Sequence, residues 1–313
     1  MALRGARHWT GVQAMLRSLI PCRLWRFALV TPVFLAACVD IDGAGLFGRC
    51  DSLFADGRAP IAPITDVLPL CEEDGANVFF ATGYARPLYH GGWSAYRLDE
   101  TQARATLDDP LPRPRLRFRR NPKLDANGTL QPTHDDYTGT GWDRGHLAPN
   151  GALAWNADAQ RASFTVANIA PQSPKMNRNI WRCFEVSIRE WAAHSNRTFV
   201  VVGTVDGGRA MTGERDLDRL PIAVPTHFIA VVYRTAPNPI ALGVMVPNEP
   251  GHRDIRRYVM SVAALEERTG YRFGLAPAIA SRQPDLAQWP TRVVTKEYLG
   301  RLPPIDKQCP PAF

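Results

Sequence analysis

Short apolar runs separated by turn residues predict a β-sheet in this chain. Residues 78–80 and 93–98 have the composition of short strands, and two glycines separate them. Residues 198–204 and 227–233 are continuous apolar runs bounded by turn residues. Such runs are typical of strands that are buried on both faces, so we expect these two strands at the centre of the sheet.

Two other segments have apolar side chains at helical spacing. The first, residues 180–193, has a stripe formed by Trp181, Phe184, Ile188 and Trp191. The second, residues 256–269, ends before Gly270, where a helix C-terminus is expected. We interpret both stripes as faces that pack on the core. Strands before, between and after these helices predict a mixed α+β domain.

The domain has predicted limits on both sides. Residues 38–75 are rich in Gly, Pro and Asp and show no clear periodicity, so we interpret them as a linker or an irregular extension. The domain itself is expected over residues 76–300, with residues 301–313 as a C-terminal tail. The sequence shows no internal repeat and no second domain boundary.

Composition narrows the class of protein. The chain is 45% hydrophobic and 21% charged, which excludes a disordered, collagen-like or coiled-coil protein. Its formal net charge of +7 includes five arginines and no acidic residue in residues 1–37, which leaves +2 for the rest of the chain. A polyanion-binding surface would therefore depend on local clusters of charge.

The N-terminal residues 1–37 predict an export signal. The arginines are followed by an apolar stretch, residues 27–37, which fits a signal peptide and is too short to span a bilayer. Residues 35–38, Leu-Ala-Ala-Cys, resemble a bacterial lipobox. We therefore expect cleavage before Cys38 and a lipoprotein anchored to a membrane by lipid on Cys38, in the periplasm or on the cell surface. A plain secretory signal and, third, a mitochondrial transit peptide are the alternatives.

The cysteines that remain after such cleavage and lipid attachment are Cys50, Cys71, Cys183 and Cys309. An even number in an exported protein predicts disulfides, and four cysteines allow three connectivities. Their spacing does not indicate zinc, because the sequence has no Cys-x-x-Cys pair or Cys/His cluster. Free buried thiols are the alternative.

The densest local charge lies in residues 112–123. Every second residue from Arg113 to Arg119 is an arginine, so an extended chain would place all four on one face. A row of guanidinium groups at this spacing suits a phosphate backbone. An edge strand that charge protects from aggregation is an equally good interpretation, and charge alone does not decide between them.

A glycine-rich segment, residues 136–150, contains Asp143-Arg144-Gly145-His146, which we expect in a loop. This tetrapeptide resembles the DRGH signature of the DNA/RNA non-specific endonucleases, the ββα-metal family that includes Serratia-type nucleases and endonuclease G. Residues 167–172 and 176–185 resemble the family's next two segments, and later matches follow in the same order up to residue 270. The resemblance covers roughly residues 76–280 and implies an α+β fold with a central antiparallel sheet flanked by helices.

The resemblance implies a role for each matched polar residue. His146 would be the general base, and its ordinary pKa of about 6.5 lets it accept a proton from water at neutral pH. Asn177 would hold Mg²⁺ or another divalent cation such as Mn²⁺, since Mg²⁺ often keeps several waters around one or two protein oxygens. The alternative for Asn177 is a helix N-cap.

Glu185 lies eight residues after Asn177, which is a rise of about 12 Å along a continuous helix. We therefore expect Glu185 to accept a hydrogen bond from a water on the ion rather than to bind the ion directly. By resemblance, Arg189 would face the scissile phosphate. A structural pair with Glu185, one helical turn earlier, is its alternative.

Two more arginines are candidates for binding phosphate. Arg120 matches the family's upstream phosphate-binding arginine, because Arg120 and Asp125 reproduce its R-x-x-x-x-D spacing, and Arg119 is the adjacent competitor. Arg144, inside the signature, is the other candidate clamp. We expect Asp143 to orient its loop rather than to contact the substrate, because a carboxylate repels phosphate.

These residues predict a metal-dependent endonuclease that hydrolyses phosphodiester bonds in DNA and RNA. Discrimination between sequences should be poor, because such a site engages phosphate rather than base edges. Family members often pair, so a homodimer is a further expectation. The alternatives are a phosphodiesterase that acts on small substrates with the same site, and a non-catalytic nucleic-acid-binding lipoprotein.

Overall fold

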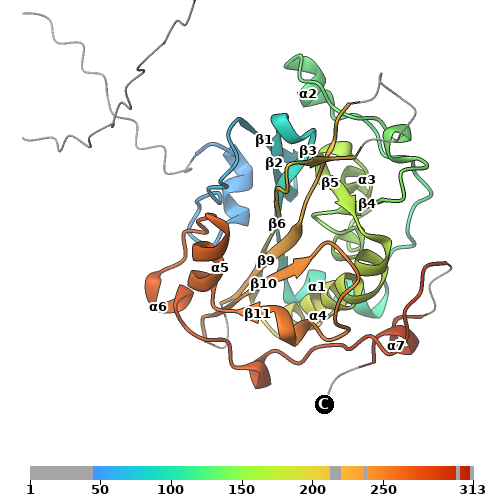
Figure 1. Ribbon diagram of the computed structural model, residues 1–313. Coiled ribbons are helices and arrows are strands. Elements are labelled where there is room, and N and C mark those ends of the chain that lie inside the picture. Colours follow the sequence, from blue (N-terminus) through green and yellow to red (C-terminus); the bar gives the residue numbers. More distant parts are fainter. Residues whose placement is uncertain (1–44, 212–219, 236–237, 301–303, 311–313) are drawn as a thin grey trace, which may run out of the picture. The chain divides into compact units, whose positions relative to one another are not determined.

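The structure is a computed structural model that describes residues 45–211, 220–235, 238–300 and 304–310 (Figure 1). The predicted export signal and the lipobox cysteine, Cys38, lie outside these residues. No helix among the residues described has the length and apolar composition needed to cross a bilayer.

A seven-stranded antiparallel sheet forms the centre of the domain, in the order β1-β2-β3-β6-β9-β10-β11. Its strands are β1 (Val67–Glu73), β2 (Val78–Ala85), β3 (His90–Asp99), β6 (Arg197–Val205), β9 (His227–Arg234), β10 (Ile240–Pro247) and β11 (Val259–Met260). The four strands predicted from apolar runs are β2, β3, β6 and β9, and β6 and β9 pair with each other near the middle of the sheet.

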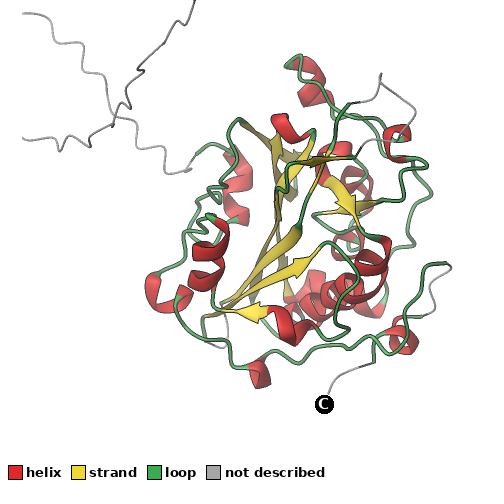
Figure 2. Ribbon diagram, in the orientation of Figure 1, coloured by secondary structure: helices red, strands yellow, loops and turns green. Residues whose placement is uncertain are grey.

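Helices cover both faces of this sheet (Figure 2). The helices are α1 (Glu100–Asp108), α2 (Pro122–Ala126), α3 (Ala157–Ser163), α4 (Arg182–Ala192), α5 (Val262–Thr269), α6 (Pro277–Ala280) and α7 (Ile305–Gln308). Short 3-10 turns are η1 (Gly48–Leu53), η2 (Arg86–Leu88), η3 (Asp135–Tyr137), η4 (Asn150–Leu153), η5 (Val166–Asn168), η7 (Ile255–Tyr258) and η8 (Leu286–Gln288). This arrangement confirms the predicted α+β class.

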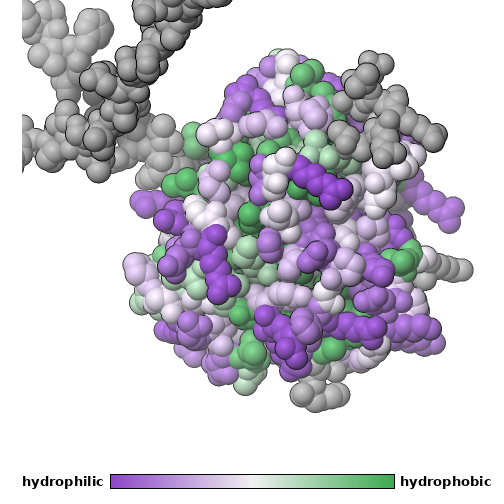
Figure 3. All heavy atoms as spheres, in the orientation of Figure 1, coloured by the Kyte–Doolittle hydropathy of each residue, from purple (hydrophilic) through white to green (hydrophobic). Residues whose placement is uncertain are grey.

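Side-chain alternation along the central strands produces one large core on each face of the sheet. In β9, Ala230 and Val232 pack in the core that contains α4, whereas Ile229 and Val231 pack in the core that contains α5. Both sets are apolar, which explains why this central strand is a continuous apolar run. On the face shown in Figure 3, hydrophilic residues cover most of the surface and apolar residues form only small groups.

The two predicted helices are present with different starts. The aromatic stripe of residues 181–191 packs in the core, as expected, but α4 is preceded by a π-helical turn, η6 (Met176–Trp181). The predicted helix 256–269 begins only at Val262, because Ser261 caps α5 and the residues before it form η7 and β11. Gly270 ends α5 in the left-handed region, with φ 76°, as its position predicted.

The structure corrects both expected limits of the domain. Residues 38–75 are not simply a linker, because η1 and β1 lie within them and a disulfide joins Cys50 to Cys71. At the other end, residues 304–310 are not a free tail: Cys309 is fully buried and forms a disulfide with Cys183. Of the three possible connectivities, the structure therefore has the pairs 50–71 and 183–309.

Two small sheets lie outside the central one, and the first carries the DRGH segment. Strand β4 (Asp143–His146) pairs antiparallel with β5 (Ile169–Gln172), and β7 (Arg209–Ala210) pairs with β8 (Ala223–Val224). The predicted loop at residues 143–146 is therefore a strand. Gly145 is required there, because a β-carbon would overlap the side chain of Gln172 on the paired strand. Together β4, β5 and the helix formed by η6 and α4 make a ββα unit.

Candidate active site

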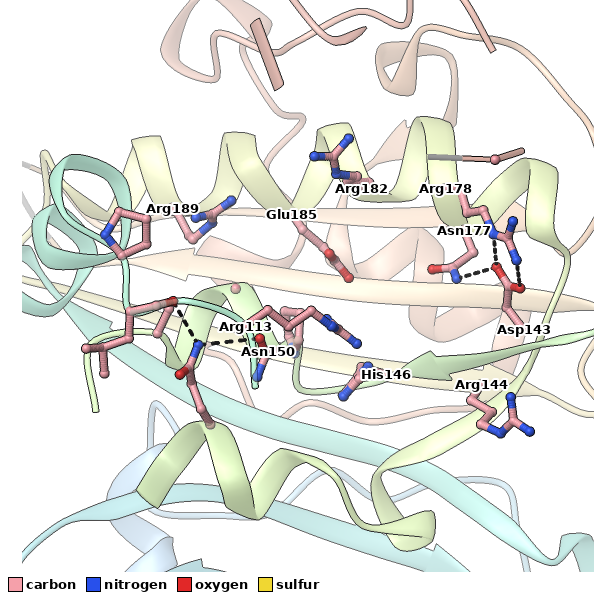
Figure 4. A pocket seen from close by; sticks show the side chains of 17 residues that line it. Arg113, Asp143, Arg144, His146, Asn150, Asn177, Arg178, Arg182, Glu185 and Arg189 are labelled. Atoms are coloured by element: carbon pink, nitrogen blue, oxygen red, sulfur yellow. Dashed lines mark hydrogen bonds and ion pairs between the residues drawn. The ribbon is translucent and has the colours of Figure 1, made fainter. Parts of the chain in front are cut away.

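A cleft of about 500 Å³ lies between β4 and the helix formed by η6 and α4 (Figure 4). Its charged and polar lining residues are Arg113, Asp143, Arg144, His146, Asn150, Gln160, Asn177, Arg178, Arg182, Glu185 and Arg189. Five of the six site residues expected from the sequence therefore line one cleft, and Arg120 does not.

His146 ends β4 with its imidazole packed against two aromatic rings. The ring centroid lies 5.0 Å from that of Phe118 and 5.4 Å from that of Phe164, which meets it edge-on. Its Nε2 atom is buried and has no hydrogen-bond partner among the described residues. Burial, with a smaller contribution from the positive charge of Arg113, lowers the pKa of His146 well below 6.5. His146 is therefore neutral at pH 7 and has a lone pair available to accept a proton.

Asn177, at the start of η6, is held by the first residue of the DRGH strand. Its Nδ2 donates to Asp143 Oδ2 at 2.9 Å, and Arg178 Nε donates to the same oxygen at 2.8 Å. The amide nitrogen of Asn177 is thus fixed on Asp143, and its oxygen points into the cleft (Figure 4). The alternative role of Asn177 as an N-cap is wrong, because the residue lies inside the π-helical turn and its side chain makes no capping bond.

Glu185 lies on α4 and faces the cleft among arginines (Figure 4). Burial raises the pKa of Glu185 to about 7, although the charges of Arg189, Arg113 and Arg182 act in the opposite direction. Arg189 Nη1 donates to the main-chain oxygen of Thr106 at 2.9 Å. Within the described residues Arg189 forms no ion pair with the Glu185 carboxylate, and its side chain lines the cleft.

Two of the expected phosphate-binding arginines, Arg120 and Arg144, donate hydrogen bonds to other residues of the protein. Arg120 donates to Asp125 Oδ1 from Nε at 3.0 Å and to the main-chain oxygen of Gln131. The R-x-x-x-x-D spacing is therefore a structural ion pair away from the cleft, and the expectation for Arg120 is not supported. Arg144 does line the cleft, but its Nε and Nη2 donate to the main-chain oxygen of His134, which ties it to the segment before the motif.

The predicted single face of arginines is divided in the structure. Arg117 forms an ion pair with Asp135, and Arg119 Nη2 donates to the main-chain oxygen of Arg161 at 3.2 Å. Arg113, in contrast, points into the cleft, and its guanidinium carbon lies 5.1 Å from the centroid of the Phe164 ring (Figure 4). No described residue gives Arg113 a hydrogen bond or ion pair.

Sequence reasoning missed three arginines of the cleft as site residues. Arg178 and Arg182 lie near Asn177 on the same helical segment, and helical spacing from Asn177 and Glu185 could have identified both. Arg113 was recognised only as one member of a row. The signal for its separate role is tertiary, since Phe164 receives its guanidinium.

The cleft suits a divalent ion that keeps most of its water. No group of three or more His, Cys, Asp and Glu side chains in the described part of the chain could enclose a metal. The Asn177 amide oxygen is oriented by its bond to Asp143, and the Glu185 carboxyl faces the same space (Figure 4). One oriented neutral oxygen with a nearby carboxylate fits Mg²⁺ or Mn²⁺ completed by water and substrate oxygens.

The chain belongs to the DNA/RNA non-specific endonuclease family, whose model matches residues 79–278. This confirms the family expected from the DRGH segment. The mitochondrial endonuclease G of Homo sapiens is 31% identical over 160 residues, covering 48% of this chain and 53% of that protein. A nuclease of Nostoc sp. is 31% identical over 166 residues, covering 50% and 58%. The mitochondrial nuclease EXOG of Xenopus laevis is 28% identical over 194 residues, covering 58% and 52%.

This chain thus spans about half the length of the curated relatives it matches. Among solved structures, it resembles a chain from the crystal structure of the EndoG/EndoGI complex, described as showing the mechanism of EndoG inhibition. The TM-score is 0.52 at 20% identity, covering 65% of this chain and 84% of that one. This similarity supports the shared fold.

Proposed function

We propose that this protein is a divalent-cation-dependent endonuclease that hydrolyses phosphodiester bonds in both DNA and RNA. The observation that carries the proposal is the neutral His146, whose Nε2 has no partner, in the same cleft as the oriented amide oxygen of Asn177. A neutral imidazole can act as a general base toward water, and a bound divalent cation can stabilise the charge that develops on phosphate oxygens.

Each cleft residue would have a separate task. His146 would take a proton from the attacking water, and the packing of Phe118 and Phe164 on its ring would keep the imidazole in one orientation. A divalent ion held by Asn177 would stabilise negative charge on the phosphate oxygens and the leaving group. Glu185 would accept a hydrogen bond from water in the ion's hydration shell.

Arginines would bind the phosphate itself. Arg113 is the best candidate, because it points into the cleft and has no anionic partner among the described residues. Arg189 would supply positive charge from the opposite wall, where it is already anchored to Thr106. A guanidinium group fits the oxygens of a phosphate and carries no information about the base, so we expect little sequence preference.

The direct test is to incubate purified residues 39–313 with plasmid DNA and with RNA, in Mg²⁺, in Mn²⁺ and in a chelator. We expect internal cuts in both polymers that require the cation. Absence of cation-dependent cleavage of either polymer would refute the proposal. Cleavage of bis(p-nitrophenyl) phosphate without cleavage of polymers would favour the phosphodiesterase for small substrates.

We further propose that the protein is exported and anchored by lipid on Cys38. The two disulfides support an oxidising compartment, since disulfides are rare in the cytosol. The test is metabolic labelling with palmitate in a bacterial host, comparing the wild type with Cys38→Ala. Labelling of the wild type alone is expected, whereas an unlabelled wild type free in the periplasm or medium would favour a plain secretory signal. Gel filtration of the purified protein would test the proposed homodimer.

A further inference from the structure

A C-terminal strap runs along the helix that carries Asn177 and Glu185. We define the strap as residues 289–300 and 304–310, which follow the part of the chain that the family model matches. At the far end of α4, Trp191 Nε1 donates to the main-chain oxygen of Pro290 at 2.6 Å. One residue earlier in α4, Glu190 Oε1 accepts from Arg292 Nε at 2.8 Å. The strap then continues toward the π-helical turn η6.

The strap is hydrogen-bonded to this turn through the side-chain amide of Asn179. The main-chain nitrogen of Tyr298 donates to Asn179 Oδ1 at 2.7 Å, and Asn179 Nδ2 donates to the main-chain oxygen of Tyr298 at 3.2 Å. Asn179 is 2% exposed, so both bonds are made in the interior. Such buried polar groups are expensive to leave without partners.

Gln308 makes a second set of bonds to the same turn. Its Nε2 donates to the main-chain oxygen of Arg178 and, at 3.3 Å, to Asn179 Oδ1. Its Oε1 accepts from Nη1 of Arg182, which lines the cleft. Gln308 is fully buried, and the next residue, Cys309, is bonded covalently to Cys183 on α4. Four positions between 178 and 183 are therefore tied to the strap.

The π-helical turn η6 is hydrogen-bonded both to the DRGH strand and to the strap. On the cleft side, Asp143 accepts from Asn177 and Arg178. On the strap side, Arg178 Nη1 also donates to the main-chain oxygen of Leu299. The guanidinium of Arg178 thus bridges the carboxylate that orients Asn177 and the strap. π-helical turns are rare and their hydrogen bonding departs from that of an α-helix, so external partners for the turn are physically important.

We propose that the strap is part of the catalytic apparatus, with Gln308 and the Cys183–Cys309 disulfide as positioning elements for the Asn177 amide. This inference rests on the proposed function of the cleft for its effect on cleavage. Errors of about 1 Å in the placement of reacting groups can lower a rate by roughly 10²-fold. Outer partners of metal ligands typically change metal affinity or activity by about 10–100-fold when removed.

The test uses residues 39–313 with two variants and one matched control. Gln308→Ala removes the bonds to the turn and leaves the disulfide intact, and Cys183→Ser/Cys309→Ser removes the disulfide. The control is Cys50→Ser/Cys71→Ser, because this second disulfide joins η1 to β1 and neither cysteine lines the cleft. The measurements are kcat and KM on plasmid DNA, Mn²⁺ affinity by electron paramagnetic resonance, hydrogen exchange of residues 176–182, and Tm.

We expect both strap variants to weaken Mn²⁺ binding and to lower kcat by about tenfold or more at subsaturating Mn²⁺, with KM for DNA changed much less. Hydrogen exchange should accelerate in residues 176–182 and stay unchanged in the central sheet. The control should lose thermal stability but keep Mn²⁺ affinity and kcat.

A loss of Tm in the strap variants with wild-type Mn²⁺ affinity, exchange and kcat would show that the strap only stabilises the fold, and would overturn the proposal. Equal losses in the control would overturn it as well. If the wild type cleaves no nucleic acid, the proposed function fails, but Mn²⁺ affinity and hydrogen exchange still decide whether the strap positions Asn177.

Discussion

Replacing Glu185 with glutamine is expected to stabilise the metal-free protein while lowering its cleavage of nucleic acid. Burial raises the pKa of this carboxyl from 4.5 to about 7, despite the nearby positive charges of Arg189, Arg113 and Arg182. The folded protein therefore holds the proton more tightly than the unfolded chain. The stability that this difference contributes is present below pH 4.5 and is lost as the pH rises through about 7.

The magnitude follows from the size of this shift. A change from 4.5 to about 7 corresponds to about 3 kcal/mol at roughly 1.36 kcal/mol per pH unit. Glu185 faces an open cleft, so solvent reduces the penalty, and we expect about 1–2 kcal/mol for ionisation at pH 8. Glutamine has the same shape and carries no charge. For a domain of this size, 1 kcal/mol shifts Tm by roughly 2–4 °C, which predicts a rise of about 2–8 °C.

The assay is thermal unfolding in a chelating buffer at pH 8 and pH 5. At pH 8, Glu185→Gln should have the higher Tm, and at pH 5 the difference should be much smaller, because the folded wild-type protein then keeps the carboxyl protonated and only the unfolded chain still gains from its ionisation. His146 is common to both proteins, so its titration cancels in the comparison. The control is Glu267→Gln on the exposed face of α5, which removes the same charge at a position outside the cleft. An equal or lower Tm for Glu185→Gln at pH 8 would refute the reasoning.

Three further predictions concern the cleft. His146→Ala should keep the fold and lose roughly 10²–10⁴ in cleavage rate, and near-normal cleavage by the folded variant would place the base elsewhere. Arg113→Ala should raise KM and reduce the salt dependence of nucleic-acid binding by about one phosphate contact. Arg120→Ala should change stability by less than about 1 kcal/mol and leave KM nearly unchanged. A titration of nucleic acid at several salt concentrations measures both, and the opposite ranking of the two variants would contradict the structure. Asp143→Asn should lower Mn²⁺ affinity by roughly 10–100-fold, because it weakens the contact that orients Asn177, and unchanged affinity by paramagnetic resonance would show that Asp143 has no such role.

Short motifs that resemble those of the family were enough to select three residues that line the cleft. His146, Asn177 and Glu185 lie in short motifs, and the aromatic stripe of the following helix predicts the face that packs on the core. These predictions depend on neighbours within one or two turns of the chain. The structure brings all three into one cleft, and their catalytic and metal-binding roles stay predictions.

The errors arise where distant partners determine the outcome. The spacing of Arg120 and Asp125 suggested a phosphate clamp, but a long arginine side chain points to whichever acceptors the fold provides, here Asp125 and Gln131. Strand β1 was missed because only Leu70 is fully buried in it and Pro69 interrupts the pattern, as edge strands allow. The run that forms β10 satisfies the same criterion as β9 and could have been recognised.

The bond between Cys183 and Cys309 also determines when the helix that carries Asn177 and Glu185 reaches its final covalent state. Cys309 is synthesised 126 residues after Cys183, so the bond cannot close while the intervening chain is still on the ribosome. Disulfides persist in oxidising compartments and are rare in the cytosol. A chain kept in a reducing cytosol therefore lacks this covalent tie beside η6, whereas an exported chain acquires it. Under the proposed function and export, synthesis order and compartment would together protect the nucleic acids of the producing cell.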